Sequence, residues 1–216
     1  MNRPSQNIDA QLIASGMALL PQTGCAGLSV RKLVEHAGVN LGMFHYHFKN
    51  KDNFLRVLLQ HMYEEMFAAL TLRAQAQALQ GGARSLDAAL RVLASFAGKH
   101  RHLLLMLLSE ATRGEALPAA FLRENLPRHI TVLARLLRQG QAEGDIIDAP
   151  PMQLLPFMLG AIAGPVFAGG ALERLPAAPP ELAALAQQAL LSDQAIGLRI
   201  DLAMRAILIA KETAPP

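Results

Sequence analysis

The chain has 216 residues, of which 52% are hydrophobic and 17% charged, and its formal net charge is +3. This length and composition suit one large or two smaller folded domains with a substantial core, and they argue against a disordered chain. The single cysteine, Cys25, cannot form an internal disulfide, and the N-terminus shows no charged-then-apolar signal segment. We therefore expect a cytoplasmic protein.

The positive charge is concentrated near the N-terminus. Residues 1–61 contain six Lys or Arg and three Asp or Glu, whereas the remaining 14 basic and 14 acidic residues cancel. A basic segment favours a polyanion such as DNA through the release of condensed counterions. The charge alone fits an ordinary solvated surface as well, so it does not identify DNA as the partner without a supporting motif.

Apolar residues recur at helical spacing along the whole chain, and no alternating strand pattern is evident, which predicts an all-α fold. A first helix is expected from about Ile8 to Leu20, ending near Pro21 and Gly24. It would brace the segment that follows.

Residues 29–51 predict two short helices joined by a tight turn. Ser29 is placed to cap a helix over residues 30–37, and Gly38 can supply the turn. Asn40 is placed to cap a second helix over residues 41–48, which Phe44 and Phe48 would anchor on the first. This is the layout of a helix-turn-helix DNA-binding motif. The outward polar side offers contacts to bases and phosphates from His45, Tyr46, His47, Lys49 and Lys51.

Further helices are expected up to the C-terminus. A long one follows Lys51 and is stopped by Gly81 and Gly82, and Ser85 can cap the next. The apolar run over residues 103–108 predicts a central, enclosed helix. Pro127 is expected to start or kink a helix ending at Gly144, residues 172–180 to form a loop, and residues from about Ser192 to Lys211 to form the last helix.

Residues 149–172 carry no formal charge and are long enough to cross a bilayer. Four prolines interrupt them, and no aromatic belt or basic loop flanks them, so we expect no membrane span. Gly160 and Gly164 allow close helix packing, which favours an interface with a symmetry mate. The candidate dimer contacts are Gly160, Gly164, Ile200 and Ile207.

The segment from residue 8 to about residue 58 resembles the DNA-binding domain of the tetracycline-repressor (TetR) family of bacterial regulators. The resemblance rests on the Ala-Gly-Val turn at residues 37–39, the short second helix with Gly42, Phe44 and Tyr46, and the sequence His-Phe-Lys-Asn-Lys at residues 47–51. Beyond residue 58 the likeness is one of architecture. It implies a helix-turn-helix domain over residues 1–52 and a larger helical domain over residues 53–216 for effector binding and dimerisation.

The resemblance implies a ligand-responsive transcriptional regulator, usually a repressor, that binds a palindromic operator in double-stranded DNA as a homodimer. It places Leu41, Gly42 and Met43 at the base-facing start of the recognition helix, and Ser29, Arg31 and Lys51 at the phosphate backbone. Many members carry a hydroxyl residue at the position of Met43 and a tyrosine at that of His45. Leu41 and Met43 could instead contact thymine methyl groups, so the operator sequence is left open.

A small apolar or amphipathic effector is expected in the larger helical domain. The candidate ligand contacts are Phe67, Phe96, Met106, Glu110, Phe121, Met158 and Phe167, although each also suits ordinary core packing or, for Glu110, solvent. No cofactor and no metal are expected, because His100, His102 and His129 have no acidic or thiol partners near them in sequence.

Two other classes of function remain as alternatives. A DNA-binding regulator of the same fold could respond to a protein partner in place of a small molecule. A helical enzyme is a remote alternative, since the sequence shows no paired acid–base spacing, phosphate-binding loop or nucleophile motif. We therefore expect the chain not to be an enzyme.

Overall fold

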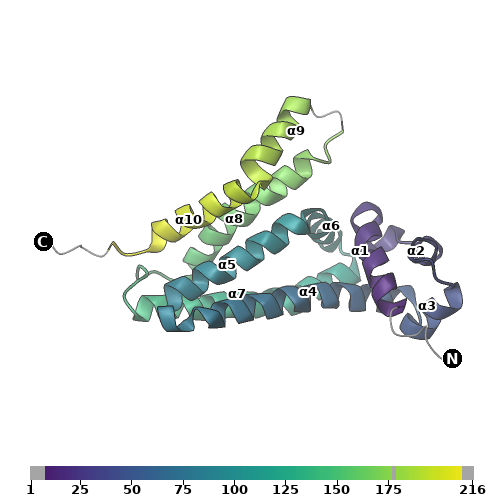
Figure 1. Cartoon of the computed structure of the whole chain (residues 1–216), viewed down its shortest axis with the longest axis horizontal. Helices are drawn as coiled ribbons and strands as arrows, with labels where there is room; N and C mark the ends of the chain where they lie inside the picture. The colour runs from purple at the N-terminus through teal and green to yellow at the C-terminus, as the bar shows by residue number, and fades with distance from the viewer. Residues whose placement is uncertain (1–7, 177–178, 211–216) are drawn as a thin grey trace, which may run out of the picture. The chain divides into compact units, whose positions relative to one another are not determined.

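The computed structural model describes residues 8–176 and 179–210, and within these ranges the fold is all-α, as the sequence predicts (Figure 1). The chain divides into two compact units. Unit 1 contains the described residues up to Glu65 together with Leu103–Asn125, and unit 2 contains Met66–His102 and the described residues from Leu126 onward. Each unit is described separately below.

Unit 1 is built on α1 (Ile8–Gly27), α2 (Val30–Ala37) and α3 (Leu41–Phe48). It also holds the first part of α4 (Lys51–Ala76), most of α6 (Arg101–Thr112) and the start of α7 (Ala116–Ala142). Its core joins buried leucines to a cluster of three phenylalanine rings. The rings of Phe44, Phe48 and Phe54 lie with centroids 4.9 to 5.8 Å apart.

Helix α1 is packed so closely on α4 that one position has no room for a side chain. A Cβ atom at Gly16 would lie 2.7 Å from the Phe54 ring. Helix α1 also extends past its expected end, because Pro21 is accommodated inside it and the helical conformation breaks only at Gly24, with φ 70° and ψ 172°. A proline removes one donor from a helix, and the packing of α1 outweighs that loss.

Unit 2 holds the rest of α4 and α7, the short 3-10 turn η1 (Ala78–Gln80) and α5 (Gly82–Lys99). The first residue of α5 packs closely on the backbone of α7. A Cβ atom at Gly82 would lie 2.3 Å from the backbone nitrogen of Gly140. The expected cap by Ser85 is wrong: α5 begins at Gly82, whose N–H donates to the Glu143 carboxylate at 2.6 Å. Ser85 is buried, and its hydroxyl has no hydrogen-bond partner within residues 8–176 and 179–210.

The C-terminal part of unit 2 consists of α8 (Pro151–Leu172), α9 (Pro180–Ala186), the π-helical turn η2 (Gln187–Leu191) and α10 (Asp193–Ile207). Helices α8 and α10 pack against each other, and α5 contacts both. The Arg199 guanidinium donates to the carbonyl oxygens of Ala189 and Leu190 and so supports η2. The sequence patterns did not reveal α9 and η2.

Several expected boundaries differ from the observed ones. Pro127 lies inside α7, which ends at Ala142, two residues before Gly144. The run over residues 103–108 is only partly enclosed, because Leu103 and Leu107 are buried whereas Leu108 is 48% exposed. The last helix ends at Ile207, and Lys211 lies outside the described residues.

Candidate DNA-binding surface

The helix-turn-helix motif of residues 29–51, called the reader segment below, starts with α2. The caps predicted for its two helices are confirmed. The Ser29 hydroxyl accepts a hydrogen bond from the backbone N–H of Lys32. Gly38 ends the helix in the left-handed conformation with φ 67°, and its N–H donates to the carbonyl oxygen of Glu35 at 3.1 Å. A residue with a Cβ would be strained there, so glycine makes the tight turn possible.

Helix α3 follows at once, and the Asn40 side chain accepts from the backbone N–H of Met43 at 2.9 Å. Phe44 and Phe48 point into the core of unit 1 and are 0% and 4% exposed. Because they share one face of α3, the other face is left to solvent. That exposed face carries Leu41, Gly42, His45 and Tyr46, of which Tyr46 is 78% exposed.

The end of α3 is held by side chains that also belong to the candidate DNA-contacting set. Lys49 ends α3 with a positive φ of 63°, and its carbonyl oxygen lies 2.9 Å from His45 Nδ1. Lys51 Nζ donates to the carbonyl oxygen of Ala26 at 2.8 Å, which ties the start of α4 to the end of α1. Lysine has two further N–H donors, so this bond leaves Lys51 able to contact a phosphate.

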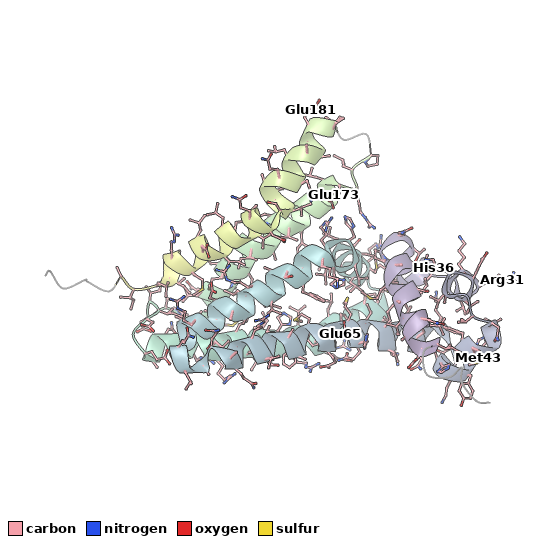
Figure 2. All side chains as sticks on the ribbon, in the orientation of Figure 1. Arg31, His36, Met43, Glu65, Glu173 and Glu181 are labelled. Carbon is pink, nitrogen blue, oxygen red and sulfur yellow. The ribbon has the colours of Figure 1, made fainter. Side chains whose placement is uncertain are left out.

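The ten residues proposed for DNA contact therefore all lie on α2, α3, the adjoining turns and the first position of α4. Six are exposed: Arg31, Leu41, Gly42, His45, Tyr46 and Lys49. Four are partly covered: Ser29, Met43, His47 and Lys51. Figure 2 marks Arg31 on α2 and Met43 on α3. His47 packs its ring against Tyr46 and Phe48, and its buried Nε2 has no hydrogen-bond partner in the described part of the chain.

The candidate effector contacts divide between the two units. Unit 1 holds Met106, Glu110 and Phe121, and unit 2 holds Phe67, Phe96, Met158 and Phe167. In unit 2, the Arg128 guanidinium lies 4.5 Å from the centre of the Phe67 ring, Phe96 packs on His100, and Met158 is fully buried. Of the seven, only Phe121 lines the hollow of about 430 Å³ that unit 1 forms between α4 and α7.

Glu110 has a partner inside the protein. It is 5% exposed and accepts the backbone N–H of Cys25 with both carboxylate oxygens. Sequence reasoning missed this contact, because nothing local relates residues that are 85 positions apart. The His45–Lys49 contact was missed as well, although a histidine four residues before a helix end is a recognisable signal for capping the last carbonyl groups.

The four candidate dimer contacts fall into two pairs. Gly160 and Gly164 are exposed, and a Cβ at either would meet no described residue within 4 Å. Ile200 and Ile207 are 2% and 1% exposed within a single chain, so their side chains already pack inside unit 2. By length and composition α8 is apolar enough to cross a membrane, a test that core helices of soluble proteins also pass.

A small ion-pair cluster lies in unit 2. Both Arg101 and His102 contact Glu173, and the Arg101 bonds hold the pKa of the Glu173 carboxyl below its ordinary value. Across the described part of the chain, no three His, Cys, Asp or Glu side chains gather so that they could hold a metal ion.

Comparison with known proteins relates this surface to one family of regulators. Residues 12–58 match the family model of bacterial regulatory proteins of the tetR family. Over these residues the chain is similar to TetR-family regulators. The match covers α3, its caps and the start of α4, which are the elements that build the exposed reader face.

The curated relatives agree with this likeness. The HTH-type transcriptional regulator BetI of Paraburkholderia phymatum is 29% identical over 75 residues, which are 35% of this chain. The match covers only 38% of that regulator, so the likeness concerns one region and not the whole protein. The relatives are regulators and not enzymes, in line with the expectation for this chain.

Solved structures extend the likeness in fold to nearly the whole chain. The structure of the ketosteroid transcriptional regulator KstR2 of Mycobacterium tuberculosis aligns with 96% of this chain and over 98% of its own length. The TM-score is 0.65 and the sequence identity is 17%. The structure of the transcriptional regulator FadR of Bacillus subtilis, solved in complex with stearoyl-CoA, aligns with 85% of this chain and over 97% of its own length. The TM-score is 0.61 and the sequence identity is 20%. The likeness in fold thus includes the C-terminal helices.

Proposed function

We propose that this protein is a cytoplasmic transcriptional regulator of the TetR family, most simply a repressor, that binds a palindromic operator as a homodimer and leaves it when a small molecule binds. The observation that carries the proposal is the exposed face of α3. Its hydrophobic residues Phe44 and Phe48 anchor the helix, while the opposite face and the neighbouring Arg31 and Lys49 are accessible to a DNA groove and its phosphates.

In this proposal residues 1–52 bind DNA and residues 53–216 form the effector and dimer domain. The exposed apolar residues of α8 and α10 support the dimer. Helix α8 exposes Met152 and Phe157 beside the bare surface at Gly160 and Gly164, and α10 exposes Leu198 and Leu202. Two copies of such a surface bury one another's apolar area, and the two readers then reach half-sites about 34–36 Å apart.

A small apolar or amphipathic effector is proposed for the larger domain. The structural neighbour FadR was solved with stearoyl-CoA, an amphipathic molecule. Such an effector must bind the DNA-free state more tightly, and a coupling of about 1–3 kcal/mol lowers operator affinity about 5- to 150-fold. A thermal-shift screen would find it, since a ligand of the folded state raises Tm. Control by a protein partner is favoured if no compound does so.

The proposal is tested by removing exposed side chains from the reader face. We would combine Arg31→Ala, His45→Ala and Tyr46→Ala and measure binding to duplexes selected from a random pool, with a gel-shift assay. A matched control combines His61→Ala, Leu72→Ala and Arg73→Ala, which are exposed on α4. The reader variant should keep its helical circular dichroism and lose DNA binding, while the control keeps both. Full binding by the reader variant would contradict the assignment.

A further inference from the structure

A hydrogen bond fixes which ring nitrogen of His45 is left free. Nδ1 lies 2.9 Å from the carbonyl oxygen of Lys49, and a carbonyl oxygen can only accept. In the neutral ring the hydrogen must therefore sit on Nδ1. Nε2 then carries a lone pair and acts as an acceptor.

The local backbone keeps the carbonyl group of Lys49 within reach of the ring. Among the described residues, Lys49 is the one residue other than glycine with positive φ. Its own N–H donates to the His45 carbonyl oxygen at 3.0 Å, which closes the last turn of α3. The His45 ring also meets the Phe44 ring edge to face, with centroids 5.5 Å apart. The ring is thus oriented before any DNA arrives.

The free nitrogen belongs to the face proposed to enter the major groove. His45 is exposed and follows Leu41 by four residues, so the two lie on the same side of α3. Leu41, Gly42 and Met43 have no side chain that forms strong hydrogen bonds, and the hydroxyl of Tyr46 can both donate and accept. His45 is therefore the residue on this face with one defined polarity toward a base.

We infer that His45 selects an adenine or a cytosine through Nε2, an inference that rests on the proposed DNA binding. In the major groove the adenine N6 and cytosine N4 amino groups are donors, whereas guanine and thymine present acceptors. An acceptor nitrogen pairs with either amino group and is repelled by guanine O6 or thymine O4. His45 is thus a specificity-determining residue of the reader helix.

The first experiment compares the base preferences of three proteins. Duplexes are selected from a random pool at pH 8, where imidazoles are neutral, by the wild type, His45→Ala and His61→Ala. The wild type should prefer adenine or cytosine at one position of each half-site. His45→Ala should reduce that preference about 2- to 12-fold, the value of one hydrogen bond. His61 is exposed on α4, outside the reader, so its variant should select as the wild type does.

The second experiment needs no variant and tests the atom. At the selected position, purine in place of adenine, or 2-pyrimidinone in place of cytosine, removes only the amino group and should weaken binding by a similar factor. In the adenine case, 7-deazaadenine keeps the amino group and should bind normally. A preference for guanine or thymine at that position, or no change with His45→Ala, overturns the inference alone. If the wild type selects no duplex, the proposed function fails as well.

Discussion

In unit 1, both carboxylate oxygens of Glu110 accept the backbone N–H of Cys25, at distances of 3.1 and 3.2 Å. The contact lies where α1 breaks, and a Cβ at Gly24 would come within 2.3 Å of a Glu110 oxygen. Lys51 holds the next carbonyl group, that of Ala26. An anion from α6 and a cation from α4 thus fix the segment that leads into the reader helices.

Glu110→Ala should lower the free energy of unfolding by about 1–3 kcal/mol, because it leaves the buried N–H of Cys25 without an acceptor. Glu110→Gln keeps one oxygen acceptor at the same distance and should lower the free energy of unfolding by less than Glu110→Ala does. Urea denaturation with an unchanged m-value would measure both. Equal stability of the alanine variant and the wild type would show that the carboxylate does not support α1.

The Cys25 thiol should be unreactive in the folded protein. Burial raises its pKa to about 12, and the hydrogen bond and negative charge of Glu110 act in the same direction. Since the thiolate is the reactive species, labelling by a thiol reagent at pH 8 should be slow until urea unfolds the chain. Removing the carboxylate lowers the pKa, so Glu110→Gln should label faster than the wild type. Rapid labelling of the native wild type would contradict this environment.

Gly160→Leu should produce folded monomers. A Cβ atom at this position has no neighbour within 4 Å among the described residues, so a side chain there should hinder a partner copy before its own chain. Sedimentation velocity should show a dimer for the wild type and a monomer for the variant, with similar helical content. Ala69→Leu, on an exposed position of α4, serves as the control and should remain a dimer. A dimeric Gly160→Leu protein would place the interface elsewhere.

Glu173 should stabilise unit 2 only above acidic pH. The hydrogen bonds from Arg101 are the largest cause that lowers the pKa of the Glu173 carboxyl below its ordinary 4.5. Its contribution is therefore complete above about pH 4.5 and is lost as pH falls through the lower, folded-state value. Glu173→Gln should lower Tm at pH 7, and the difference from the wild type should shrink on acidification. A difference that stays constant down to pH 2 would rule out this ion pair as its source.

The sequence predicted the reader segment well because its determinants are local. Ser29, Gly38 and Asn40 act on backbone groups at most four residues away, so residue type and spacing were sufficient. Prolines were less informative. Pro21 and Pro127 both lie within helices, because the packing of α1 and α7 compensates for one missing donor.

Contacts between distant residues could not be predicted from the pattern. Glu110 and Cys25 are 85 residues apart, and no local sequence pattern around either residue indicates that they form a hydrogen bond. The same holds for Ile200 and Ile207: their spacing showed an apolar face of α10, but only the fold shows that this face is covered within the chain. Whether the ten reader residues touch DNA stays a prediction.

The cap on α5 has a consequence for how the protein folds. The N-terminal turn of this helix takes its acceptor from Glu143, 61 residues further along the chain, while its own Ser85 hydroxyl is left unused. That turn gains its cap only once the end of α7 has formed and docked. Gly82 and its neighbours should accordingly be among the later amides of α5 to acquire protection from hydrogen exchange during refolding.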